Sequence, residues 1–374
     1  MAKRPDPNEV RRFIISNLEE HSTDIVKTIA EFFEISRQAA HAHVAKLVKE
    51  GHVISEGQTR KRRYIFNSTE ITHRLQLTKH DDEDRAWREF VGPHLSELSD
   101  NVQTICYHGF TEIFNNAIDH SESLYVTISL TKTVYDVTLR IHDTGVGIFE
   151  KIRSRFRLED QRQAILELSK GKLTTDPSRH SGEGIYFTSK MFDCFSILSN
   201  HLFFIHWAGR EDWLIEDRSD HFQGTGVRMS IARDSKLKPS DVYDKYISDT
   251  DENEYAFSKT HVPLSLAIYG NENLISRSQA KRVLRRFERF KEVMLDFDGV
   301  ESVGQAFTDE IFRVFYLANP DINVYAINAS DQVRKMIRRA ISAREDTPKS
   351  LPSLDDEAVK PRRARPKSKP TDSD

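Results

Sequence analysis

Three short glycine pairs, each at the border of an apolar run, constrain the fold of this chain more than any other feature. The pairs are Gly145 with Gly147, Gly182 with Gly184, and Gly224 with Gly226. The first follows the strand-like run YDVTLRIH, the second opens the helix-like run GIYFTSKMFD, and the third enters the strand-like run VRMSI. Glycine lets a backbone approach a ligand closely, and the amides at the start of a helix favour phosphate. These turns therefore indicate a pocket for a phosphate-bearing ligand.

A polar helix face lies just before the first of these turns. In the segment FTEIFNNAIDHS, Glu112, Asn116 and His120 recur at intervals of four, which places them on one face of a helix. Apolar residues that pack occupy the other positions: Ile113, Phe114, Ala117 and Ile118. A carboxylate and an amide thus face one site, and together with the glycine turns they suit a nucleotide pocket.

The segment from about Asp81 to Arg233 resembles the GHKL superfamily, the ATP-binding fold of histidine kinases and gyrase, with the motifs in family order. The resemblance implies an α/β sandwich over residues 81–235, with a mixed sheet and helices on one face. It implies ATP and Mg²⁺ as cofactors. A hard cation prefers oxygen ligands, which an asparagine amide, phosphate and water supply.

The resemblance also implies a role for each matched residue. Glu112 takes the position of a general base, and Asn116 coordinates the magnesium ion that is bound to the triphosphate. Asp143 accepts a hydrogen bond from the adenine amino group. Gly145 and Gly147 shape the base pocket. Gly182 and Gly184 contact the phosphates, and Thr225 lies near adenine.

A basic segment between residues 149 and 181 occupies the position of the ATP lid in this superfamily. Its cations include Lys151, Arg153, Arg155, Arg157, Arg162, Lys170, Lys172 and Arg179. For most of them we expect a solvated, charged helix, for which QRQAILELSKGK has a suitable pattern. One or two remain candidates for contact with the phosphates.

The N-terminal segment has the order of a helix-turn-helix followed by a hairpin. Two short amphipathic helices precede a helix that Ser36 caps and Gly51 ends, and two strand-like runs follow. Residues 8–67 resemble the winged-helix family, with a domain boundary near 70. The resemblance implies DNA contacts from the third helix and the basic hairpin tip: Arg37, Gln38, His41, Arg60, Lys61, Arg62 and Arg63. A protein-binding or dimerising module is the alternative.

The C-terminal segment alternates strand-like and helix-like runs from PLSLAIYG to DQVRKMIRRAI. Residues 260–343 resemble STAS-like domains, in which a phosphorylated serine follows a central strand. Here Gly304, Gln305 and Ala306 stand near the expected acceptor, with Ser302 before it and Thr308 after it. We therefore expect an interaction with a protein partner, or a homodimer, in place of a phosphorylation switch. Residues 344–374 are too poor in apolar side chains to order.

Composition sets the outer limits. A chain of 374 residues predicts several domains, here an α+β multidomain protein. No apolar stretch reaches the roughly 18 residues of a membrane span, so we expect a cytoplasmic protein without a membrane partner. The net charge of −3 means that DNA binding needs a local basic patch. Cys106 and Cys194 lack metal-site spacing and are expected to be buried thiols.

Three functions remain open at this point. The favoured one is a nucleotide-responsive, DNA-binding transcriptional regulator. An ATPase or a serine/threonine-type protein kinase acting on a protein partner is the alternative, and a scaffold that binds ATP without turnover is the third. Autophosphorylation on histidine is not expected, because His108 is on or next to the helix of Glu112 and no separate histidine-bearing helical hairpin is evident.

Overall fold

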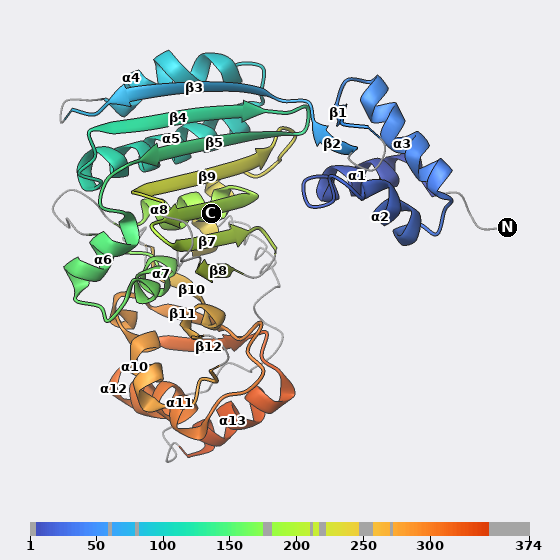
Figure 1. Ribbon diagram of the computed structural model, residues 1–374. Helices are drawn as coiled ribbons and strands as arrows, with labels where there is room; N and C mark the ends of the chain where they lie inside the picture. Colours follow the sequence, from blue (N-terminus) through green and yellow to red (C-terminus); the bar gives the residue numbers. More distant parts are fainter. Residues whose placement is uncertain are drawn as a thin grey trace, which may run out of the picture. The chain divides into compact units, whose positions relative to one another are not determined.

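A computed structural model describes residues 5–58, 62–78, 82–174, 182–209, 212–216, 222–246, 257–269 and 272–343. The chain forms two compact units, Met1–Phe257 and Ser258–Asp374 (Figure 1). Helices and strands of both units confirm the predicted α+β class. None of the described helices combines the length and the apolar character that crossing a membrane requires.

The first unit begins with three helices and a hairpin around a core of their own. They are α1 (Pro7–Asn17), α2 (Ile25–Phe32), α3 (Arg37–Lys49), β1 (Val53–Glu56) and β2 (Arg63–Phe66). Ile14, Ile29 and Val44 are fully buried where the three helices meet. The hydroxyl of Ser36 accepts a hydrogen bond from the amide of Ala39 at 3.2 Å, which fixes the start of α3 as expected.

A seven-stranded sheet with the order β3-β4-β5-β9-β6-β7-β8 forms the body of this unit. Its strands are β3 (Thr69–Gln76), β4 (Tyr125–Lys132), β5 (Asp136–Asp143), β6 (Cys194–Ser199), β7 (Leu202–Trp207), β8 (Trp213–Glu216) and β9 (Thr225–Ala232). Every neighbouring pair is antiparallel, where the resemblance implied a mixed sheet. The sequence predicts no element between residues 71 and 80. β3 escapes notice because, as an edge strand, it carries few apolar residues, Ile71 and Leu75 among them.

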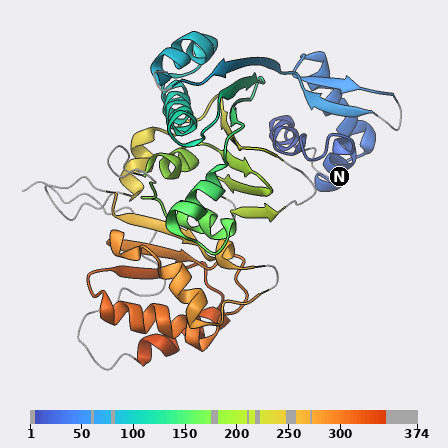
Figure 2. The same ribbon diagram turned by 60° about the vertical axis from the view of Figure 1, so that its left-hand side comes forward.

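Helices cover one face of this sheet, with α5 and α8 behind the strands in Figure 1 and beside them in Figure 2. The described helices are α4 (Glu83–Ala86), α5 (Asp100–His120), α6 (Ile148–Phe156), α7 (Gln161–Ser169), α8 (Gly184–Met191) and α9 (Pro239–Tyr246). A row of fully buried apolar side chains crosses four strands beneath them: Leu130, Leu139, Met229 and Phe195. α5 approaches this row closely at Gly109, where a Cβ atom would lie 2.9 Å from the Met229 sulfur.

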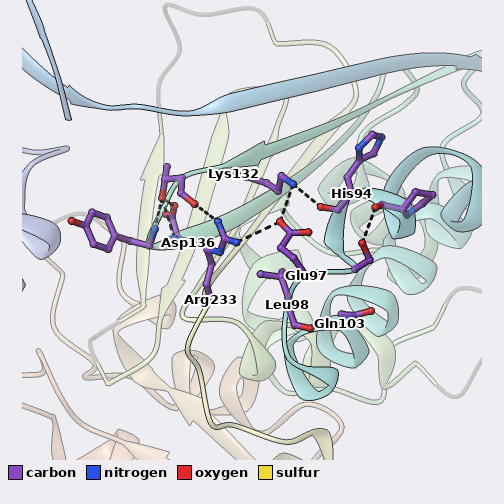
Figure 3. Close-up of polar contacts among 11 residues, drawn as sticks. His94, Glu97, Leu98, Gln103, Lys132, Asp136 and Arg233 are labelled. Carbon is purple, nitrogen blue, oxygen red and sulfur yellow. Dashed lines mark hydrogen bonds and ion pairs between the residues drawn. The ribbon is translucent and has the colours of Figure 1, made fainter. Parts of the chain in front are cut away.

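A charged cluster fastens the ends of β4 and β9 to the segment that precedes α5 (Figure 3). A carboxylate oxygen of Glu97 accepts from Lys132 Nζ at 3.0 Å and from the Arg233 guanidinium at 3.4 Å. Lys132 Nζ also donates to the carbonyl of His94 at 2.7 Å. Burial alone would raise the pKa of Glu97, but the hydrogen bond and the charges of these cations lower it overall.

The second unit contains a parallel sheet with the order β10-β11-β12. Its elements are β10 (Lys259–Pro263), α10 (Arg277–Leu284), β11 (Glu292–Asp296), α11 (Gln305–Asp309), α12 (Tyr316–Ala318), β12 (Asn323–Ile327) and α13 (Asp331–Ser342). The strand predicted at PLSLAIYG is wrong, because Leu264–Ala267 form a 3₁₀ turn after β10. Thr260 and Val262 are fully buried in β10, with His261 between them, and the polar Thr260 on the inward face hides the apolar alternation of a strand. The predicted disordered tail lies outside the described residues.

Candidate functional site

A cavity of about 270 Å³ lies at the ends of β5 and β9, under α5, α6 and α8. This volume is near the lower end of typical small-molecule pockets, about 300–1,000 Å³. The lining includes most of the residues proposed for the nucleotide site: Glu112, Asn116, Asp143, Gly147, Gly182, Gly184 and Thr225. Gly145 lies next to the cavity but is not part of its described lining. Folding thus brings together residues that are far apart in the sequence.

Asp143 is the last residue of β5 and a buried wall of the cavity, with 5% of its surface exposed. The amide of Gly145 donates to its carboxylate at 2.9 Å, and Thr225 stands opposite it on β9. Burial raises the pKa of Asp143, while hydrogen bonds from the Gly145 and Thr225 backbones pull it part of the way back. The result is an oriented hydrogen-bond acceptor on a buried wall of the cavity.

Thr225 joins the third glycine turn to the start of α6. Its hydroxyl accepts a hydrogen bond at 2.9 Å from the amide of Ile148, which is the first residue of α6. Gly147, just before it, has a left-handed φ of +85°, which few residues with a side chain tolerate. The loop after Asp143 is therefore held against β9 in one conformation.

Glu112, Asn116 and His120 all line the cavity from α5, as their spacing predicts. The Asn116 side-chain nitrogen donates to the backbone carbonyl of Glu112 at 2.7 Å. A carbonyl oxygen only accepts hydrogen bonds, so this contact identifies the nitrogen and leaves the amide oxygen as the other polar atom of the group. That orientation fits a magnesium ligand, because Mg²⁺ takes oxygen donors and keeps phosphate and water in its shell.

The glycines permit close contacts with other atoms of the chain, whereas their positions in the sequence predicted close contacts with a ligand. A Cβ atom on Gly145 would lie 1.8 Å from the carbonyl oxygen of Ser121, and one on Gly182 would lie 2.5 Å from the Leu173 backbone. At Gly184 the nearest atom is a carboxylate oxygen of Glu112, again 1.8 Å away. The close approaches are between backbone or side-chain atoms around the cavity, and they define its shape.

The basic segment after Gly147 divides into two different parts. Lys151 on α6 lines the cavity and forms an ion pair with Glu122. The expectation of a solvated helix is wrong for α7, whose residues from Gln163 to Leu168 are buried. Lys170, just after that helix, is fully buried with its Nζ 2.7 Å from a carboxylate oxygen of Glu167. Arg179 lies outside the described residues.

The apolar walls of the cavity were not predicted from the sequence. They come from α5, β5, α6 and β9: Ile113, Ala117, Ile141, Ile148, Ile152 and Val227. On α5, Ile113 and Ala117 directly follow Glu112 and Asn116 in the sequence. Their place beside the polar helix face was the signal that could have identified them. Apolar walls beside the buried carboxyl group of Asp143 suit a largely apolar ligand that carries a hydrogen-bond donor.

Five of the seven residues expected to contact DNA lie within the described residues, and all five are on the surface. Arg37, Gln38 and His41 are exposed on α3. Arg62 and Arg63 are exposed beside β2, although the Arg63 guanidinium lies 2.6 Å from the carboxylate of Glu56. Arg60 and Lys61 lie outside the described residues.

The two cysteines are buried thiols, as expected. Burial raises the pKa of Cys106 to about 12, and that of Cys194 is also raised by burial. Within the described ranges, no group of three or more histidine, cysteine or acidic side chains is placed to hold a metal ion.

The comparison with protein families concerns the second unit. A family model described as a STAS-like domain of unknown function (DUF4325) matches residues 279–334, from α10 to the start of α13. The chain therefore contains the predicted STAS-like domain at its C-terminal side. No curated protein matches the chain.

The loop before α11 bears on the phosphorylation switch that we do not expect. Thr308 is fully buried, and its hydroxyl donates within the helix to the carbonyls of Gly304 and Gln305 at 3.3 and 3.1 Å. Gly304 precedes the first residue of α11, where the resemblance places an acceptor serine. Thr308 is thus a packed helix residue, and the interaction role of this domain stays a prediction.

The raised pKa of Asp143 predicts how stability changes with pH. A carboxyl group whose pKa is higher in the folded chain weakens the fold above that pKa, and the cost disappears as pH falls toward the ordinary aspartate value, about 3.9. We expect Asp143→Asn to raise the urea midpoint at pH 8 and to raise it less at pH 4.5. Fluorescence of Trp87, Trp207 and Trp213 reports on this unit alone. An equal or larger gain at pH 4.5 would contradict the assignment.

Proposed function

We propose that the chain is an ATP-binding regulator whose nucleotide state controls DNA binding by an N-terminal winged helix. One observation carries this proposal: a single cavity collects Glu112, Asn116 and Asp143 from α5 and β5, with Thr225 opposite. These are the residues to which the GHKL resemblance assigns ATP binding. The buried acceptor Asp143, the amide group of Asn116 and the first residue of α8, Gly184, all line this cavity.

In this proposal the lining residues are assigned to a base end and a phosphate end of the cavity. At the base end, Asp143 would accept from the adenine amino group while Ile141 and Val227 contact the ring. At the phosphate end, the amides at the start of α8 favour negative charge. Asn116 lies on α5 and would hold the magnesium ion, which supplies positive charge against the triphosphate.

The strands that end at the cavity also reach the N-terminal helices. β5 runs from Asp136 to Asp143, and the turn before it presents Tyr135 to the hairpin domain. The Tyr135 ring lies 5.4 Å from that of Phe66 and 5.9 Å from that of His52, between ring centroids. These are ordinary distances for aromatic contacts. A movement at the cavity end of β5 therefore has a direct route to this contact.

The turn that carries Tyr135 is held firmly from β9. The backbone amide of Arg233 donates to the carbonyl of Tyr135 at 2.8 Å, and its guanidinium donates to that of Thr133 at 3.0 Å. β2 ends at Phe66 and β3 begins at Thr69, so only Asn67 and Ser68 separate the hairpin from the sheet. Two links, one covalent and one by packing, support coupling between nucleotide and winged helix.

An enzyme that acts on a protein partner is the second candidate, and the place of Glu112 in the same cavity favours it. A carboxylate near a bound triphosphate acts as a general base toward water or a hydroxyl group, an effect of roughly 100- to 10,000-fold. We expect any phosphate release or protein phosphorylation to fall by about that factor in Glu112→Ala. Phosphate assay and transfer of labelled phosphate measure the two reactions, and turnover that survives the substitution would exclude this base.

Calorimetric titration of the intact protein with ATP and Mg²⁺ tests the pocket. Asp143→Ala and Asn116→Ala should each weaken binding by roughly 10- to 150-fold, the range for a hydrogen bond to a charged group. The exposed Asp298 of the second unit provides a control, and its replacement by alanine should leave binding unchanged. Removal of Mg²⁺ should weaken ATP binding by the wild type more than it weakens ATP binding by the Asn116→Ala variant. Absence of ATP binding by the folded wild type would refute the pocket.

The Tyr135 contact predicts a variant in which nucleotide and DNA binding are uncoupled. Fluorescence anisotropy with a mixed-sequence DNA duplex at low salt should show that ATP changes the DNA affinity of the wild type. Tyr135→Ala should abolish that change while ATP affinity stays within about twofold, because the ring lies far along β5 from Asp143. Val134→Ala alters an exposed side chain of the same turn and serves as the control. Coupling that persists in Tyr135→Ala would exclude this route.

A further inference from the structure

The carboxylate of Glu112 lies against the first residue of α8. A Cβ atom on Gly184 would be 1.8 Å from the nearer oxygen and 2.5 Å from the carboxyl carbon, so the group rests directly on the Gly184 backbone. Gly184 begins an eight-residue helix, and both residues line the cavity. Only a glycine permits this approach. The negative group thus occupies the helix end that the proposed function assigns to phosphate.

Electrostatics explains why the carboxylate rests there. The first amides of a helix lack partners within it, and the helix dipole favours a negative group at this end. A phosphate satisfies the same amides and the same dipole. Glu112 and a phosphate are therefore alternative occupants of one position, and two anions there would repel each other.

A second acidic residue makes this end of the cavity more negative. Glu183, directly before Gly184, is half-buried, and burial raises the pKa of its carboxyl group while Lys172 counteracts the rise. Its side chain is not part of the described lining of the cavity. Glu183 thus adds charge next to the helix start without lining the cavity, which makes it a matched comparison for Glu112.

We infer that Glu112 occupies the phosphate position of the nucleotide-free protein and must leave Gly184 before a triphosphate binds. The inference rests on the proposed ATP site and adds a selection step to it. Adenosine fills only the base end and leaves Glu112 in place, whereas a triphosphate binds at the cost of displacing the carboxylate. The same displacement releases Glu112 from the helix end, so the candidate base becomes available only when phosphate has arrived.

The ratio of two affinities tests this displacement. Calorimetry with the full chain would compare adenosine with the non-hydrolysable β,γ-imido analogue of ATP, each with Mg²⁺. We expect Glu112→Gln to bind the analogue about 3- to 30-fold more tightly than the wild type, the range set by a charge at a helix end. Adenosine affinity should change by less than about twofold. The analogue removes hydrolysis from the comparison.

Glu183→Gln removes one negative charge next to the same helix end and is the control. Because its side chain does not line the cavity, we expect a gain of less than about twofold for the analogue. Equal gains in the two variants would show a general charge effect and overturn the displacement. A Glu112→Gln protein that binds adenosine normally but gains nothing for the analogue would also overturn it. A folded wild type that binds neither ligand would refute the proposed function, and this inference with it.

Discussion

The pairing of β5 with β9 is the interaction on which the rest of the first unit depends. It places Asp143 opposite Thr225, and it brings the glycine turn after one strand beside the glycine turn before the other. Thr225 then accepts from the amide of Ile148 and fixes the start of α6. Gly224 lies so close that a Cβ atom there would be 2.0 Å from the Asp143 carbonyl oxygen. The cavity is the space that this backbone arrangement leaves under the helices.

The same two strands carry their consequences to the opposite end of the sheet. Arg233, directly after β9, holds the turn of Tyr135 through two hydrogen bonds to its carbonyl groups. The Arg233 guanidinium also forms an ion pair with Glu97 (Figure 3). Backbone pairing makes each strand stiff along its length, so the cavity and the aromatic contact with Phe66 are parts of one framework. Coupling in the proposed regulator would then need no separate connecting element.

Local sequence patterns were sufficient for the elements whose signal is short-range. The spacing of Glu112 and Asn116 predicted their shared helix face, and Ser36 predicted the start of α3. The pattern of apolar and polar residues gave no correct prediction where polar or charged side chains lie in a strand or in a buried helix. β3 is an edge strand with few apolar residues. In α7 the charged Glu167 is buried and forms an ion pair with Lys170, the residue after the helix. Neither situation is visible to a pattern that equates charge with exposure.

The sequence by itself determined the local chemistry: which residues are acidic, amide or glycine, and which of them share a helix or follow a strand. The tertiary structure decided what those residues face, because distance across a sheet depends on pairing and register. It placed Asp143 beside Thr225, turned the Asn116 amide by a bond to the Glu112 carbonyl, and set the Glu112 carboxylate on Gly184. It also gave the glycines their role, since a glycine turn reveals that something comes close but not whether that atom belongs to a ligand or to the chain.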